Sequence, residues 1–235
     1  MASNNYRLLF GLCVLSMLAF AVSVPSSIFS KSAADLTPQI LAGMKIDPPA
    51  DLATTKGKRT IVLAGGCFWG VEAVFEQLKG VSNVVSGYAG GSATTALYQA
   101  VSTGMTGHAE AVEITYDPQQ ISAGQLLKIY FLVAHDPTQI DRQSPDTGTQ
   151  YRSAIFFTNP AQQQVAADYI IKLNRASVFE RPIATQLVPL TKFYPAEDSH
   201  QNFIARNPNY PYVVVHDLPK LARLRQQFPD LIKKG

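Results

Sequence analysis

The chain has 235 residues, of which 46% are hydrophobic and 16% are charged. This composition is typical of one folded domain with an appendage, and it excludes a disordered chain. Lys and Arg number 20 against 17 Asp and Glu, a net charge of +3, and no basic cluster accompanies this small excess, so nothing indicates nucleic-acid binding.

The N-terminus has the pattern of an export signal. Arg7 precedes an apolar run over residues 8–24, and Ala19-Phe20-Ala21 has the small-residue spacing that a signal peptidase reads. We therefore predict a signal peptide over residues 1–24 and a periplasmic or extracellular protein. An uncleaved membrane anchor is the alternative, because roughly seventeen apolar residues are near the lower limit for a span.

Residues 25–58 are rich in Ser, Ala, Pro and Thr, which predicts a linker or arm before a catalytic domain over residues 59–235. The chain has two cysteines, and Cys13 lies in the export segment. Cys67 is then the only thiol of the mature chain. An unpaired cysteine in an exported protein is either a reactive thiol or an inert buried residue.

The periodic elements begin near residue 59. A short β-branched run at 60–64 predicts a buried strand, and Phe68, Val71, Phe75 and Leu78 then recur at helical spacing as far as Gly80. Further strands and helices are predicted in the order strand 81–87, strand 109–116, helix 121–134, strand 151–157, helix 161–173 and strand 184–190. This order predicts an α+β fold: a two-layer sandwich whose mixed sheet has a ferredoxin-like, split βαβ core. We expect the Asn- and Pro-rich segment after Tyr194 to wrap the surface.

Cys67 follows the Gly65-Gly66 turn and opens the first predicted helix. A helix N-terminus presents unpaired N–H groups and a positive dipole end, so a thiol held there should lose its proton more readily and act as a nucleophile. The alternative is a small hydrophobic residue in a strand–helix corner. Phe68 is in phase with the apolar stripe and suits either core packing or a substrate pocket, whereas Trp69 is out of phase and is a candidate pocket wall.

Glu110 is anomalous by strand phase. It shares a face with Val112 and Ile114, whereas Glu113 lies on the opposite, solvated face. A carboxyl group in apolar surroundings has a raised pKa and can act as an acid near neutral pH. The alternative is a frayed strand end with a solvated Glu110.

Three further residues are candidates with ordinary alternatives. Tyr151 begins a predicted strand in phase with Ile155, and Tyr98 follows the Gly90-Gly91 loop; each could be a half-buried structural tyrosine. Asp146 lies in a polar loop, where a turn-forming Asp is common. Together, a thiolate, a neutral acid, phenolic donors and an aromatic wall suit attack on an uncharged electrophile whose oxygen needs a proton, such as methionine sulfoxide.

Several motifs resemble the type A methionine sulfoxide reductase family over about residues 59–210. They are Gly66-Cys67-Phe68-Trp69-Gly70-Val71-Glu72, Gly87-Tyr88-Ala89-Gly90-Gly91, Gly107-His108-Ala109-Glu110, Tyr116-Asp117-Pro118, His135-Asp136-Pro137, Asp146, Gly148-Thr149-Gln150-Tyr151-Arg152-Ser153 and Phe193-Tyr194-Pro195-Ala196-Glu197-Asp198.

The resemblance implies a role for each candidate. Cys67 would be the nucleophile and Glu110 the acid acting on the sulfoxide oxygen. Tyr98 and Tyr151 would hydrogen-bond that oxygen, and Asp146 would orient it through water. The substrate methyl group would lie against Phe68 and Trp69. The implied substrate is the S epimer in oxidised proteins and peptides. We expect a monomer with no bound cofactor.

The chain also departs from the family pattern. Ala96-Leu97 replaces the usual Pro-Thr before Tyr98, Ser144-Pro145 replaces a Gly-rich pair, and Ser199 stands where an aromatic residue is common. Many relatives carry resolving cysteines near the C-terminus, and this chain has none. The reductant must then be external, either a thioredoxin-like protein or a small thiol.

Two other functions are alternatives for this set of residues. A cysteine hydrolase would use His135 or His200 as its base, but acyl transfer has no use for a buried Glu110. A binding module for oxidised peptides would not need the full set of nucleophile, acid and donors. No metal site is expected, because His108, His135, His200 and His216 show no ligand spacing.

Overall fold

Strand β1 (Arg59–Gly65) lies inside a six-stranded sheet of order β7-β6-β1-β3-β2-β8. The computed structural model describes residues 45–49 and 57–233, all within the unit Leu36–Gly235. The predicted export segment 1–24 and most of the 25–58 arm lie outside these residues and stay predictions. Among the described helices, none combines the length and apolar character that crossing a bilayer requires.

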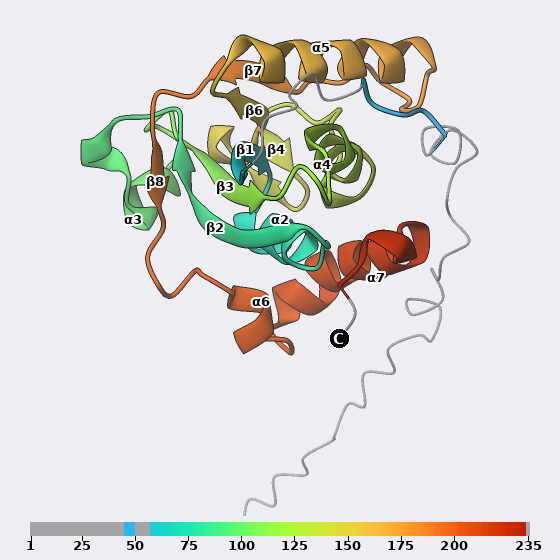
Figure 1. Ribbon diagram of the computed structural model, residues 1–235. Helices are drawn as coiled ribbons and strands as arrows, with labels where there is room; N and C mark the ends of the chain where they lie inside the picture. The colour runs from blue at the N-terminus through green and yellow to red at the C-terminus, as the bar shows by residue number, and fades with distance from the viewer. Residues whose placement is uncertain (1–44, 50–56, 234–235) are drawn as a thin grey trace, which may run out of the picture. The chain divides into compact units, whose positions relative to one another are not determined.

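The core of the sheet has the predicted split βαβ arrangement (Figure 1). β1 pairs antiparallel with both β3 (Ala109–Tyr116) and β6 (Ser153–Phe157), and β3 pairs antiparallel with β2 (Val81–Ala89). Helix α2 (Phe68–Glu76) connects β1 to β2. The parallel edge strand β7 (Gln186–Pro189) and the antiparallel edge strand β8 (Phe193–Pro195) complete a mixed sheet, so the predicted fold class is confirmed.

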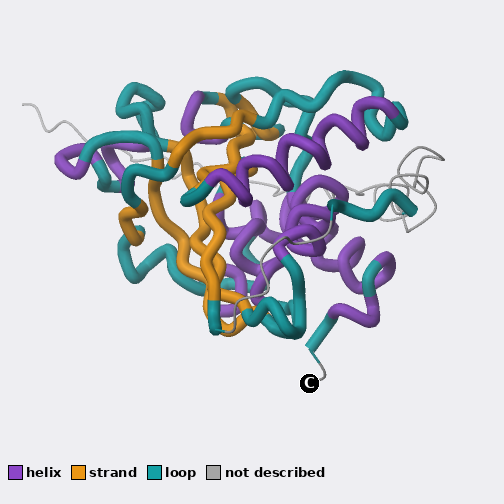
Figure 2. The backbone as a smooth tube through the Cα atoms, turned by 45° about the horizontal axis from the view of Figure 1, so that its top comes forward, coloured by secondary structure: helices purple, strands orange, loops and turns teal. Residues whose placement is uncertain are grey.

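The longer helices lie beside one face of the sheet (Figure 2) and share one apolar core with it. Helix α4 (Ala123–Ile129) begins with a full capping box at Ser122, and α5 (Pro160–Arg175) begins after the N-cap residue Asn159. α4 continues into a π-helical turn, Tyr130–Ala134. The opposite face of the sheet carries a smaller cluster of mostly small side chains: Val62, Ala64, Ala89, Ala109, Ala111, Ala154 and Phe156.

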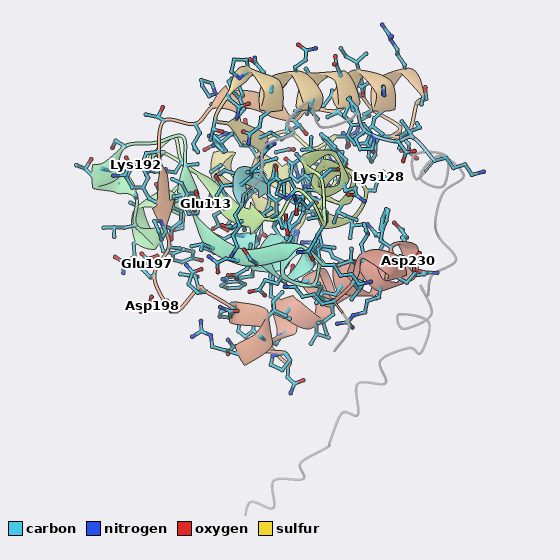
Figure 3. All side chains as sticks on the ribbon, viewed as in Figure 1. Glu113, Lys128, Lys192, Glu197, Asp198 and Asp230 are labelled. Carbon is cyan, nitrogen blue, oxygen red and sulfur yellow. The ribbon has the colours of Figure 1, made fainter. Side chains whose placement is uncertain are left out.

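The short segment 45–49 contacts this helical layer. The Ile46 carbonyl accepts a hydrogen bond of 3.2 Å from the Tyr169 hydroxyl, and Asp47 pairs with Lys128 of α4 at 3.0 Å (Figure 3). The remaining short elements lie in the loops: 3-10 turns Ala93–Thr95 and Thr149–Tyr151, helix α3 (Tyr98–Val101), and the hairpin strands β4 (Arg142–Gln143) and β5 (Asp146–Thr147).

Two predicted boundaries are wrong. α2 ends at Glu76, and Gly80, with φ +81°, belongs to the turn into β2. Tyr151 does not begin a strand: its N–H donates to the Gly148 carbonyl at 3.0 Å, which closes a 3-10 turn two residues before β6. The backbone hydrogen bond of Tyr151 is therefore local, although the residue type and phase favoured a strand.

The C-terminal segment is also different from its prediction. After β8 it forms α6 (Phe203–Arg206), a π-helical turn (Val213–Asp217), α7 (Leu218–Gln227) and a 3-10 turn (Pro229–Leu231). It buries Val213, Leu221 and Leu224 in the main core. Figure 1 shows α6 and α7 beside α2. The segment is thus part of the core rather than a surface wrap, because its turns separate short helices that each have an apolar face.

Candidate active site

The turn that carries Cys67 is supported from beneath by two side chains. A Cβ on Gly65 would lie 2.8 Å from Cγ of His135, and one on Gly66 would lie 2.5 Å from Cγ of Gln143. Gly66 also has φ +91°, in the region that favours glycine. Gln143 is held by both main-chain groups of Asp136, at 3.1 Å each. Only glycines fit this turn, and it places Cys67 at the N-cap of α2.

All seven candidate residues lie around one pocket of about 170 Å³. Four separate parts of the chain supply them: the start of α2, the start of α3, β3, and the loop from β5 to the 3-10 turn. Two tyrosines from the C-terminal segment complete the wall. The lining consists of Cys67, Phe68, Trp69, Tyr98, Glu110, Asp146, Tyr151, Tyr210 and Tyr212.

Glu110 is buried, with 2% of its surface exposed, and it shares its face of β3 with the buried Val112 and Ile114. The burial expected from strand phase is therefore confirmed. Burial raises the pKa of Glu110 to about 8, opposed by a hydrogen bond from the Phe68 N–H and assisted by the charge of Asp146. At neutral pH this carboxyl group is mainly protonated and can donate a proton into the pocket.

The Cys67 thiol is 8% exposed. Burial raises its pKa well above the ordinary value, and the charges of Glu110 and Asp217 raise it further. The Trp69 N–H and Lys220 act in the opposite direction. The expectation of a more acidic thiol is wrong, because the loss of hydration on burial outweighs the effect of the helix N-terminus on the pKa of Cys67. Protonation of Glu110 removes one of the two negative charges that raise the pKa of Cys67.

The phenols of Tyr98 and Tyr151 remain protonated donors. Burial raises the pKa of each, and the charge of Glu110 adds to the effect. Tyr98 is fixed through its N–H, which donates to Glu197 at 2.8 Å; Glu197 lies on the connection between β8 and α6 (Figure 3). Asp146 accepts a hydrogen bond from the Tyr212 hydroxyl.

Trp69 is half-buried and held on two sides. Its ring stacks on Phe203 with centroids 3.7 Å apart, and its indole N–H donates to Nδ1 of His200 at 3.2 Å. Phe68 is 1% exposed, packs in the main core and also lines the pocket. The two roles that the sequence offered for it, core packing and pocket lining, are therefore combined in one side chain. The two rings form a rigid apolar wall beside the thiol.

Sequence patterns missed Tyr210, Tyr212 and the role of His200. These residues lie in a segment with no helical or strand periodicity, so only the spacing of its aromatic residues could have marked them. The histidines do not supply a base for a hydrolase. In His135, Nδ1 donates to the Tyr130 carbonyl at 3.0 Å and Nε2 accepts from Ser153 at 2.7 Å, while His200 accepts from Trp69.

Within the described part of the chain, no three His, Cys, Asp or Glu side chains gather as metal ligands. The chemistry that the pocket offers is that of one thiol, one protonated carboxylic acid and two phenols beside an aromatic wall. On a split βαβ sandwich, this set defines a thiol enzyme in which proton donation accompanies nucleophilic attack.

Comparison with known proteins gives the family. The model described as peptide methionine sulfoxide reductase matches residues 59–232. The chain therefore belongs to the peptide methionine sulfoxide reductase family: it is an oxidoreductase of the type that reduces methionine sulfoxide.

Two relatives and two solved structures define the closeness of the match. Peptide methionine sulfoxide reductase MsrA 2 of Synechocystis is 54% identical over 191 residues, covering 80% of this chain and 89% of the relative. The MsrA 2 protein of Mesorhizobium japonicum is 54% identical over 181 residues, covering 77% and 93%. Reduced Mxr1 from Saccharomyces cerevisiae has a TM-score of 0.60 at 30% identity, covering 68% and 94%. Methionine sulfoxide reductase A of Corynebacterium diphtheriae has a TM-score of 0.58 at 39% identity, covering 66% and 77%.

Proposed function

We propose that this protein reduces methionine S-sulfoxide, free or in oxidised proteins, with Cys67 as the nucleophile and Glu110 as the acid. The observation that carries the proposal is the position of both groups in one small pocket, with the carboxyl group protonated at neutral pH. The biological result is repair of oxidised proteins.

The proposed complex uses three sides of the pocket. The methyl group of the substrate lies against Phe68 and Trp69, and the oxygen faces the donors Glu110, Tyr98 and Tyr151, with Asp146 orienting it through water. The sulfur then faces Cys67. Because methyl group, oxygen and direction of attack are each fixed by a different wall, only one configuration at sulfur fits, which accounts for selection of one epimer.

The reaction balances as follows. Cys67 releases its proton to solvent, and Sγ attacks the sulfoxide sulfur and forms an S–S bond while Glu110 gives its proton to the oxygen. The S–O and S–S bonds of this adduct then break as the oxygen passes to Sγ, which gives methionine and Cys67 sulfenic acid, and Glu110 takes up a proton from solvent. The sulfur of the substrate is reduced by two electrons and Sγ is oxidised by two.

We propose an external thiol for the return to Cys67. Within the described residues Cys67 is the only cysteine, so the sulfenic acid has no neighbouring thiol there. One external thiol displaces water to form a mixed disulfide, and a second thiol releases Cys67. A thioredoxin-like protein supplies both thiols from one molecule, and a small thiol supplies them in two collisions.

Export remains a proposal that rests on the sequence of residues 1–24. Cleavage after Ala21 would leave a mature chain beginning at Val22, in the periplasm or outside the cell. N-terminal sequencing of native material tests this: a chain that begins at Met1 would leave an anchor, or no export, as the alternative.

The decisive experiment combines one variant with two substrates. The native protein should reduce the S epimer with dithiothreitol and leave the R epimer unchanged. Cys67→Ser should show no turnover while keeping the circular dichroism spectrum and melting temperature of the native protein. Turnover retained by Cys67→Ser would exclude the whole mechanism, and equal turnover of both epimers would exclude the three-wall pocket.

A further inference from the structure

A buried ion pair lies against the first turns of α2, outside the pocket lining. Asp217, at the end of the π-helical turn, is fully buried, and its Oδ1 accepts from Nζ of Lys220 in α7 at 3.1 Å. Its second oxygen, Oδ2, has no hydrogen-bond partner among the described residues. A buried carboxylate with one free oxygen is costly, which calls for a reason beyond packing.

The pair reaches α2 through a gap that only glycine provides. A Cβ on Gly70 would lie 2.2 Å from Oδ1 of Asp217 and 2.8 Å from Nζ of Lys220. Gly70 is three residues after Cys67, in the first turn of the helix that carries the thiol at its N-cap. Two opposite charges are thus held in contact with this turn, and neither belongs to the proposed mechanism.

We propose that Asp217, balanced by Lys220, is a positioning residue that acts through Cys67: it holds the sulfur in its protonated form in the enzyme without substrate and so protects it from peroxide. This inference rests on the proposed role of Cys67 as the nucleophile. The group involved is a buried carboxylate that pairs with Lys220 against the first turn of α2, and the oxidant is hydrogen peroxide.

Of the groups that face the sulfur, Asp217 is the one left to supply a negative charge at neutral pH. Glu110 faces Cys67 from β3, and Tyr98, Tyr151 and Tyr212 face it from the loops. The phenols are neutral, and Glu110 is mainly protonated at neutral pH. Asp217 is itself faced by Lys220, by His216 and by Asp146. Burial raises the pKa of Asp217, and Lys220 opposes this effect by stabilising the carboxylate. Lys220 also attracts a thiolate at Cys67, so the two members of the pair act on the sulfur with opposite sign.

Among the described residues no second thiol lies beside Cys67, which makes such protection useful. A Cys67 sulfenic acid that waits for an external reductant can ionise and react with hydrogen peroxide: the sulfenate takes one oxygen from peroxide, giving sulfinate and water, a step that ordinary thiols do not reverse. A nearby negative charge disfavours both the thiolate and the sulfenate. The negative charge of Asp217 therefore slows the oxidation that inactivates the enzyme, and this protection needs no second cysteine.

The test measures ionisation of the sulfur in the reduced full-length protein, through the rate of Cys67 alkylation by iodoacetamide against pH, read by peptide mass spectrometry. Asp217→Asn should speed alkylation at pH 7 about tenfold, because one neighbouring charge shifts the pKa of a thiol by about one unit or more. Lys220→Met should not speed alkylation, because it removes only the charge that attracts a thiolate. The double variant should return close to the native rate. Asp230→Asn, an exposed change farther along the C-terminal segment, is the matched control and should have no effect.

The different effects expected for the two single variants distinguish an electrostatic effect on Cys67 from a local loss of packing. A local loss of packing would expose Cys67 and speed alkylation in both single variants, and that result would overturn the proposal, as would no change in either. If Asp217→Asn does not fold, Lys220→Met still tests the idea, because faster alkylation in that variant would overturn it. Sulfinate formation at Cys67 under hydrogen peroxide should rise in Asp217→Asn by a comparable factor. Neither readout involves a sulfoxide, so a protein that alkylates as expected but fails to reduce methionine sulfoxide would disprove the proposed function alone.

Discussion

The backbone N–H of Phe68 donates a hydrogen bond of 3.1 Å to Oε2 of Glu110. This contact joins the turn that carries the thiol to the strand that carries the acid. A donated N–H favours the ionised carboxylate, but burial of the side chain favours the neutral acid more strongly, and the pKa rises to about 8. The same contact therefore fixes the position of the acid without removing its proton at neutral pH.

Replacing this acid should slow the reaction without abolishing binding. General acids contribute about 10²–10⁴-fold, so Glu110→Ala should lower kcat by that order, and Glu110→Gln, which keeps an N–H donor, should lose less. Steady-state kinetics with a free sulfoxide measures the effect. Glu113→Ala is the matched control, because Glu113 lies three residues along β3 on the opposite, partly exposed face. Equal losses in the two alanine variants would contradict the assignment.

The pH dependence of kcat/KM should show the coupling of the two groups. The productive form has a proton on Glu110 and none on Cys67, which makes one proton in total on the pair. Below pH 8 both groups are protonated, so kcat/KM should rise about tenfold per pH unit as the thiol proton is lost. Above about 8 loss of the Glu110 proton offsets further thiol ionisation, and the profile should level until it passes the raised pKa of the thiol.

Glu110→Gln supplies the control for this profile, since its amide does not titrate. The bend near pH 8 should disappear and leave a single rise set by the thiol. A native profile that is flat from pH 6 to about pH 8 and falls above it would mean that the thiol is already ionised in the free enzyme.

Stoichiometric oxidation should stop at a sulfenic acid. One equivalent of sulfoxide without reductant should leave Cys67 labelled nearly completely by a sulfenic-acid probe, because no second thiol lies near it within the described residues. Intact-mass analysis under non-reducing conditions checks the result, with Cys13→Ser as the control against pairing with the export segment. A mass two daltons below that of the reduced protein would reveal an internal disulfide and exclude the single-thiol mechanism.

The glycine beneath the nucleophile should tolerate no side chain. Gly66→Ala combines a φ of +91° with a Cβ only 2.5 Å from Gln143, so it should lose about 1–3 kcal/mol by overpacking, in addition to backbone strain, together with most of its activity. Gly107→Ala is matched in backbone, with φ +77°, but its nearest neighbour would be 3.7 Å away. Thermal unfolding of both variants should therefore show the larger loss in Gly66→Ala; equal losses would mean that overlap with Gln143 has no effect.

The sequence was most informative where a charged residue stood on the apolar face of a strand with a clear alternating pattern. Glu110 stands on the apolar face of a strand, and a period of two is a strong constraint when one face is buried, so its burial could be predicted. The order of strands and helices, together with the short connections, left few topologies, and the split βαβ core followed.

Features that depend on distant contacts could not be predicted. Tyr151 has a favourable residue type for a strand, but a hydrogen bond to Gly148 places it in a turn. Tyr212 reaches the pocket from 66 residues beyond Asp146, and no local pattern encodes that meeting. The raised pKa of Cys67 could not be predicted for the same reason. It depends on how deeply the fold buries the sulfur and on the charges of Glu110 and Asp217, which are distant in the sequence.

The end of the chain is fastened to the start of the α2–β2 turn. Lys79 donates its N–H to the Leu231 carbonyl at 2.8 Å, and Lys233 donates its N–H to the Gln77 carbonyl at 2.8 Å. The other end of the segment pairs with β2 through β8. The segment that carries Tyr210 and Tyr212 is therefore anchored to the α2–β2 unit at both of its ends. The amides held in these contacts should exchange with solvent only when α2 or β2 opens, whereas amides in the middle of the segment can exchange independently.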